Sequence, residues 1–177
     1  QLPRDVRPTH YAVSLVPNPK ASTYAASVTI DIEVLQATKR ITLNALDIDF
    51  SAATLLDAKK QAHTAIISVD KDKQTASFDF DKNLAKGRYQ LQLTYKGLIG
   101  TQAVGLFSLD YDSAEGKKRA LYSQFENSEA RRMIPSWDEP YYKATFSLTV
   151  TVPKTDLPVS NMPILKTTAL PDGLNKV

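Results

Sequence analysis

The chain has 177 residues, of which 42% are hydrophobic and 23% charged, and its formal net charge is +3. This length suits one domain with a sizeable core, and so small and dispersed a positive charge gives no argument for binding nucleic acid. The absence of cysteine excludes disulfide bonds, zinc–thiolate sites and cysteine nucleophiles, and no apolar run is long enough to cross a membrane.

Alternation of apolar and polar residues predicts β-strands along most of the chain. The clearest segments, in chain order, are 28–34, 41–45, 76–80, 89–95 and 144–152. A turn signal at 70–73 predicts a hairpin between 66–69 and 76–80. Many short strands with no long helical pattern predict an all-β fold of mostly antiparallel strands, either a β-sandwich or a curved sheet. The one basic run, 117–119, is predicted to be a solvated hairpin loop.

The segment 123–146 departs from the strand pattern. Asn127 or Ser128 is predicted to cap a short helical turn over 129–132 that ends before Pro135. The Trp-Asp-Glu-Pro sequence at 137–140 then predicts a tight turn, because proline lacks an N–H and biases the preceding residue toward extended geometry. This layout can hold a short polar segment at the rim of a sheet.

Gln124 and Glu126 are the candidate binding residues. In a strand, side chains at i and i+2 project to the same face, so an amide and a carboxylate would lie side by side. Such a pair suits a cationic group such as an ammonium. The pattern alone favours the alternative, in which both side chains face water or pair with Arg131 or Arg132.

The other polar residues of this segment have structural interpretations. Arg131 and Arg132 are predicted to form ion pairs with Asp138 and Glu139 that hold the turn in place. Trp137 is predicted to fill the core or an interdomain contact. Adjacent residues in a strand point apart, so Asp138 and Glu139 are not predicted to act as a catalytic carboxylate pair.

The two histidines, His10 and His63, are predicted to be surface or strand-end residues. A catalytic zinc site normally uses three protein ligands, and neither histidine belongs to an H-E-x-x-H pattern. The sequence therefore predicts no metal site and no catalytic residue within this chain.

A set of short motifs follows the chain from end to end. They are Leu2-Pro3, Pro8-Thr9-His10-Tyr11, Gly105-Leu106-Phe107, Gln124-Phe125-Glu126, Ala130-Arg131-Arg132, Trp137-Asp138-Glu139-Pro140, Val152-Pro153 and Ser160-Asn161-Met162-Pro163. This set resembles the N-terminal domain of the zinc aminopeptidases typified by aminopeptidase N, and the block from 124 to 146 is its most specific part. Ser136 stands where many relatives have cysteine, a change expected to be neutral for chemistry.

The resemblance implies a saddle-like β domain over 1–177 that stops short of its final strand or strands. It implies a thermolysin-like catalytic domain later in the chain as partner, which holds zinc and acts on peptides with a free N-terminus. Glu126 would receive the α-amino group of the peptide, and Gln124 would line the pocket for its first side chain. By itself, this chain is expected to be inactive.

Other functions remain open. A non-catalytic protein-interaction scaffold with the same fold is the main alternative. An epoxide hydrolase-type relative fits less well, because its characteristic residue at the position of Glu126 is glutamine. A carbohydrate-binding module would need an exposed aromatic platform that is not evident.

The start of the chain gives little information about its compartment. It begins with Gln1, so either an upstream segment was removed or the chain is an excised piece, and no charged leader followed by an apolar block is visible. We favour a secreted or periplasmic location over a cytoplasmic one.

Overall fold

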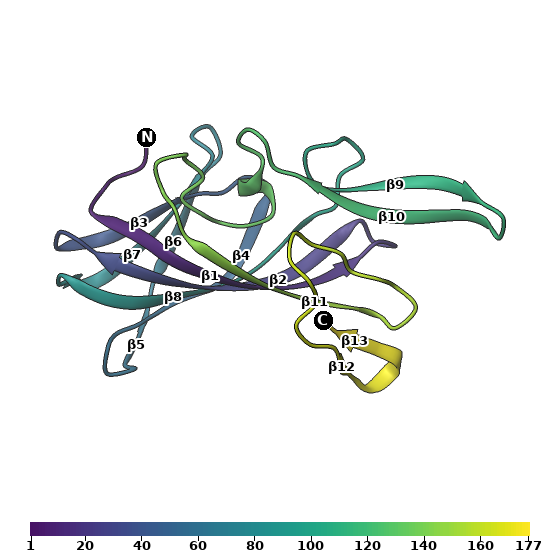
Figure 1. The fold of residues 1–177 in the computed structure, drawn as a ribbon. Helices are drawn as coiled ribbons and strands as arrows, with labels where there is room; N and C mark the ends of the chain where they lie inside the picture. The colour runs from purple at the N-terminus through teal and green to yellow at the C-terminus, as the bar shows by residue number, and fades with distance from the viewer.

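The computed structural model describes residues 1–177 and is almost entirely β-structure (Figure 1). The strands are β1 Val6–Asn18, β2 Thr23–Val34, β3 Thr38–Asn44, β4 Ile48–Leu56, β5 Ala62–Thr64, β6 Ile66–Asp70, β7 Thr75–Leu84, β8 Gly87–Leu98, β9 Gly105–Ser113, β10 Gly116–Gln124, β11 Thr145–Pro153, β12 Thr168–Ala169 and β13 Leu174–Lys176. The helical elements are two 3₁₀ turns, η1 Ala130–Arg132 and η2 Pro171–Gly173. The prediction of an all-β fold is confirmed. The structure has no helix with the length and apolar character needed to span a membrane.

The strands form three sheets. The large sheet has eight strands in the order β12-β13-β11-β1-β2-β8-β4-β5. A smaller sheet has the order β3-β7-β6, and β9 and β10 form the third sheet, which has two strands. Every strand pairing is antiparallel except that of β1 with β11. In Figure 1 the large sheet forms a curved layer, the small sheet lies above it, and the β9–β10 hairpin projects to the right. The predicted hairpin at 66–80 is confirmed as β6 and β7.

The core sits between the large and small sheets. Every second residue of β2 from Tyr24 to Val34 is buried, which is the alternation predicted for a strand with one covered face. Phe50 of β4 meets Phe78 of β7 edge to face, with ring centroids 5.5 Å apart. The buried side chains of 30 residues form a single hydrophobic cluster that joins the two layers.

Two sequence predictions need correction. The basic residues 117–119 lie within β10, because the hairpin turn falls at 114–115. β11 forms as predicted, but its apolar face is open at its start, with Phe146 60% and Leu148 44% exposed, whereas Val152 near its end is buried. Alternation identifies a two-faced strand, whereas the burial of a face depends on which other elements lie against it.

Gly97 of β8 allows a close approach by Tyr24 of β2. The two residues are directly opposite each other, and a Cβ added at Gly97 would lie 2.2 Å from the Tyr24 hydroxyl oxygen and 2.4 Å from Cζ. That hydroxyl donates a hydrogen bond to the backbone carbonyl of Arg132 at 2.8 Å. The glycine therefore makes room for a contact between the sheet and η1.

We expect Gly97→Ala to lower the free energy of unfolding by about 1–3 kcal/mol, because the methyl group displaces the Tyr24 ring. Chemical denaturation measures this loss. Gly100→Ala is the matched control, since its added Cβ would meet nothing closer than 3.7 Å. Equal losses in the two variants would contradict the explanation.

Candidate functional site

Gln124 and Glu126 lie where the β9–β10 hairpin joins the loop that leads to η1. Gln124 is the last residue of β10, whereas Glu126 lies in the turn that follows the strand. The prediction that the two side chains share a strand face is therefore wrong, because the strand ends before Glu126. Both side chains are exposed, and the peptide bond between Glu126 and Asn127 is cis.

The carboxylate of Glu126 has no hydrogen bond or ion pair in the structure. The two arginines that could have neutralised it have other partners. Arg131 pairs with Asp138, and Arg132 pairs with Glu129 and Asp47. The part of the alternative in which Glu126 pairs with an arginine is therefore wrong, whereas the part in which its side chain faces water agrees with the structure.

The pair of Arg131 and Asp138 holds the loop beyond Glu126. Its Nε–Oδ2 distance is 2.9 Å, and the two side chains are only 14% and 13% exposed. Arg131 also donates to the side-chain oxygen of Gln74 at 3.1 Å. The predicted ion-pair cluster is thus confirmed for Arg131 and Asp138. Glu139 takes no part in it, because its carboxylate accepts the backbone N–H of Leu2 at 2.6 Å.

Two tyrosines of the large sheet hold the other side of this loop. The hydroxyls of Tyr24 and Tyr95 both donate to the backbone carbonyl of Met133, at 3.3 and 3.0 Å. Burial raises the pKa of both phenols well above the ordinary value, so both remain protonated donors at neutral pH. Sequence analysis missed them, although a tyrosine at an inward position of a strand needs a hydrogen-bond partner for its hydroxyl.

The helical turn begins one residue later than predicted and lacks the predicted cap. η1 covers only Ala130–Arg132, and Glu129 occupies its N-cap position without a side-chain hydrogen bond. Ser128 instead donates its hydroxyl to the side-chain oxygen of Asn127. Trp137 is buried in the core as predicted, and its backbone N–H donates to the hydroxyl of Tyr11 at 3.2 Å.

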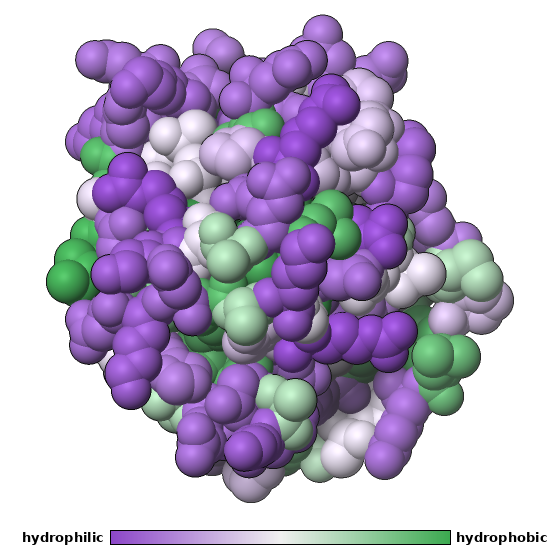
Figure 2. All heavy atoms as spheres, turned by 90° about the vertical axis from the view of Figure 1, so that its left-hand side faces the viewer, coloured by the Kyte–Doolittle hydropathy of each residue, from purple (hydrophilic) through white to green (hydrophobic).

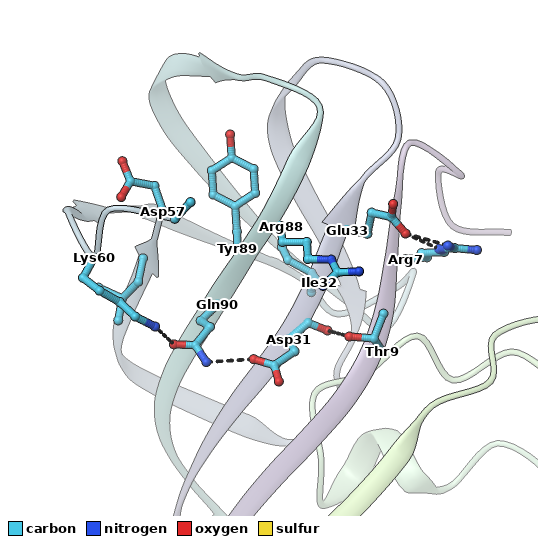
Figure 3. Close-up of a pocket in the computed structure, with 12 residues that line it drawn as sticks. Arg7, Thr9, Asp31, Ile32, Glu33, Asp57, Lys60, Arg88, Tyr89 and Gln90 are labelled. Carbon is cyan, nitrogen blue, oxygen red and sulfur yellow. Dashed lines mark hydrogen bonds and ion pairs between the residues drawn. The ribbon is translucent and has the colours of Figure 1, made fainter.

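One pocket has a volume of about 490 Å³ and is lined by residues of β1, β2 and β8 and by the end of β4 with the residues that follow it. Figure 3 shows a chain of hydrogen bonds in it, in which Lys60 donates to Gln90 and Gln90 donates to Asp31. Arg7 and Glu33 pair with each other beside this chain. Hydrophilic side chains also cover most of the face seen in Figure 2. The side chains of Lys60 and Asp31 contact only the neutral amide of Gln90, and Arg88 lines the pocket without an ion pair, so the pocket keeps charges of both signs that no ion pair neutralises.

The histidines take part in local contacts. The ring nitrogens of His10 lie 2.7 Å from the hydroxyl of Thr145 and 3.0 Å from that of Ser147. His63 lies 3.6 Å from a carboxylate oxygen of Asp57. No three histidine or acidic residues gather as they would around a metal ion, so the residues of this chain do not fit a zinc ion.

Comparison of the sequence with known proteins shows which family it matches. Residues 7–177 match the Peptidase M1 N-terminal domain. The chain is 37% identical to the aminopeptidase N of Acetobacter pasteurianus over 177 residues, which are 99% of this chain and 48% of that protein. It is 32% identical to aminopeptidase M1 of Arabidopsis thaliana over 171 residues, 94% of this chain and 19% of that protein.

Aminopeptidase 2 of Candida albicans is 32% identical over 177 residues, 99% of this chain and 19% of that protein. The chain thus spans about half the length of the bacterial relative and about a fifth of the plant and yeast relatives. Since the family match extends over nearly the whole sequence, the chain belongs to the Peptidase M1 N-terminal domain family.

Proposed function

We propose that this chain is the N-terminal domain of a zinc-dependent metallo-aminopeptidase, in which the carboxylate of Glu126 binds the α-amino group of a peptide. The observation that carries the proposal is the exposed, unpaired carboxylate of Glu126 at the edge of a firmly held loop. The names of the relatives, which are aminopeptidases, support the reaction class.

An anchor for an ammonium group must keep its charge free and its position fixed. The loop after Glu126 is held on one side by the ion pair of Arg131 and Asp138. On the other side the tyrosine hydroxyls of the sheet hold it. A peptide whose ammonium pairs with Glu126 has its first amide bond at a fixed distance from that point, so cleavage is limited to the N-terminal residue.

Gln124 and the hairpin contribute the surroundings of the anchor. We assign the exposed amide of Gln124 to the wall of the pocket for the first side chain. Leu109, Tyr111 and Tyr122 share its face of the hairpin by the strand register, and about half of each side chain is exposed. This uncovered apolar face supports packing against the catalytic domain of the longer protein, which would place the hairpin over the cleft.

Zinc in this proposal belongs to that catalytic domain. It would supply the Lewis acid and the activated water for amide hydrolysis. The part assigned to the present chain is to bind the ammonium group and to orient the peptide.

A non-catalytic scaffold is the second candidate. The open face of β11, which carries Phe146 and Leu148, favours a protein-binding role for the domain. In that case the free carboxylate of Glu126 has no substrate to bind.

The longer protein is expected to hydrolyse alanyl- and leucyl-p-nitroanilide and to cleave their N-acetylated forms at least about 30-fold less efficiently, because acetylation removes the ammonium group. Dialysis against a chelator should abolish the activity and zinc should restore it. The 177-residue chain, assayed as control, should be inactive. If the zinc-loaded longer protein hydrolysed none of these substrates, the aminopeptidase proposal would fail and the non-catalytic scaffold would remain as the function.

A further inference from the structure

A second pocket lies beside the loop that follows Glu126. It is bounded by the start of β1 and by the segment that joins η1 to β11. Its volume is about 250 Å³. Its lining includes the aromatic residues Tyr11, Trp137, Tyr142 and Phe146 and the acidic residues Asp138 and Glu139. An aromatic pocket that also contains acidic groups suits an organic cation.

The two carboxylates of this pocket differ in how they are neutralised. Asp138 pairs with Arg131 at 2.9 Å. Glu139 accepts only the backbone N–H of Leu2 and forms no ion pair. Glu139 is therefore the acidic residue of the pocket that no ion pair neutralises.

The charge of Glu139 acts on the aromatic lining. Burial raises the pKa of Tyr142, and the charge of Glu139 raises it further. Among the other charged groups near this ring, Arg4 lowers the pKa and Asp5 raises it.

One aromatic ring next to the pocket already binds a guanidinium group. The Cζ atom of Arg4 lies 4.3 Å from the ring centroid of Tyr141, and Tyr141 contacts Tyr142 edge to face. Phe146 stacks on Tyr11 with centroids 4.7 Å apart and rings 3° from parallel. Because Phe146 is 60% exposed, its other ring face is open to a second cation.

We propose that this pocket binds the side chain of an arginine or lysine from a peptide or protein segment. The cation lies over the open face of Phe146 and pairs with the carboxylate of Glu139. A volume of about 250 Å³ is below the roughly 300–1,000 Å³ typical of pockets for drug-sized ligands, which fits a single side chain. The site requires neither zinc nor the ammonium anchor at Glu126.

Trp137 lines the pocket and is the only tryptophan of the chain, so its fluorescence reports binding to the 177-residue chain. The probes are Nα-acetyl-arginine amide and Nα-acetyl-citrulline amide. Both lack the ammonium group that Glu126 would bind, and citrulline has nearly the shape of arginine without its charge. We expect a saturable change in Trp137 fluorescence with the arginine probe. Its Kd should be about three- to tenfold lower than that of the citrulline probe.

Glu139→Gln removes the charge but keeps an oxygen that can accept the N–H of Leu2. We expect it to weaken arginine binding about three- to tenfold and to leave citrulline binding unchanged. Asp49→Asn is the matched control, because it removes the same charge from a carboxylate that pairs with Lys96 on another surface. Thermal unfolding of each variant checks that the fold is retained.

Three outcomes would overturn the proposal. Equal affinity for arginine and citrulline would show that charge is not recognised. Equal weakening by Glu139→Gln and Asp49→Asn would show a response to net charge alone. No fluorescence change with arginine at any concentration would show that the pocket does not take the side chain.

Discussion

Replacing Glu126 with alanine in the longer protein is expected to lower kcat/KM for free-amine peptides by about 30- to 4,000-fold. This range corresponds to the 2–5 kcal/mol lost when one partner of a desolvated charge pair is removed. The effect should be this large because the carboxylate has no other partner in the structure and the catalytic domain, once it covers the cleft, would exclude water from the pair that Glu126 forms with the ammonium group. Steady-state kinetics with leucyl-p-nitroanilide measures it.

Two comparisons make this test specific. The slow turnover of N-acetylated substrates should be nearly unchanged in Glu126→Ala, so that the preference for a free amine shrinks with kcat/KM. Glu115→Ala, at the tip of the same hairpin where Glu115 pairs with Lys118, should leave activity unchanged. If Glu126→Ala behaved like Glu115→Ala, the anchor role would be lost even for an active aminopeptidase.

The division of the effect between kcat and KM has its own meaning. Removing an anchor that is used equally in the substrate complex and the transition state raises KM alone. Removing an anchor that also aligns the amide bond lowers kcat as well. We expect both changes for Glu126, because its position limits which amide bond can reach the catalytic groups.

The strands and the core could be predicted from sequence because period-2 alternation encodes the two faces of a strand. β2 and β8 show this clearly, since their inward residues are buried along most of each strand. β11 shows the limit of the method. Its Phe146 side alternates in the same way, but Phe146 and Leu148 remain exposed while Val152 is buried. Burial depends on which other elements lie against each position, and local sequence carries no information about that.

The sequence singles out the candidate residues Gln124 and Glu126, but it did not predict their geometry. The rule for side chains at i and i+2 assumed a strand through Glu126, whereas β10 ends at Gln124. The partners of the acidic and basic residues come from distant segments. Arg132 reaches Asp47, 85 residues away, and Glu139 binds Leu2, 137 residues away. Local pattern cannot choose between such partners.

Arg131→Met is expected to lower the free energy of unfolding by about 3 kcal/mol, since it leaves the carboxylate of Asp138 buried without its cation. For a chain of this length the melting temperature should then fall by about 6–12 °C. The methionine keeps much of the apolar stem, so the loss reports the guanidinium contacts with Asp138 and Gln74. Thermal and chemical denaturation measure the two quantities.

Arg40→Met is the surface control for this prediction. Arg40 pairs with Asp79 at 2.7 Å, but its side chain is 60% exposed, and exposed pairs contribute little to stability. The double variant Arg131→Met/Asp138→Leu should regain part of the stability lost in Arg131→Met, because it removes the buried charge left without a partner. If Arg131→Met cost no more than Arg40→Met, the ion pair would not be what holds the Glu126 loop, and the rigidity on which the anchor depends would need another source.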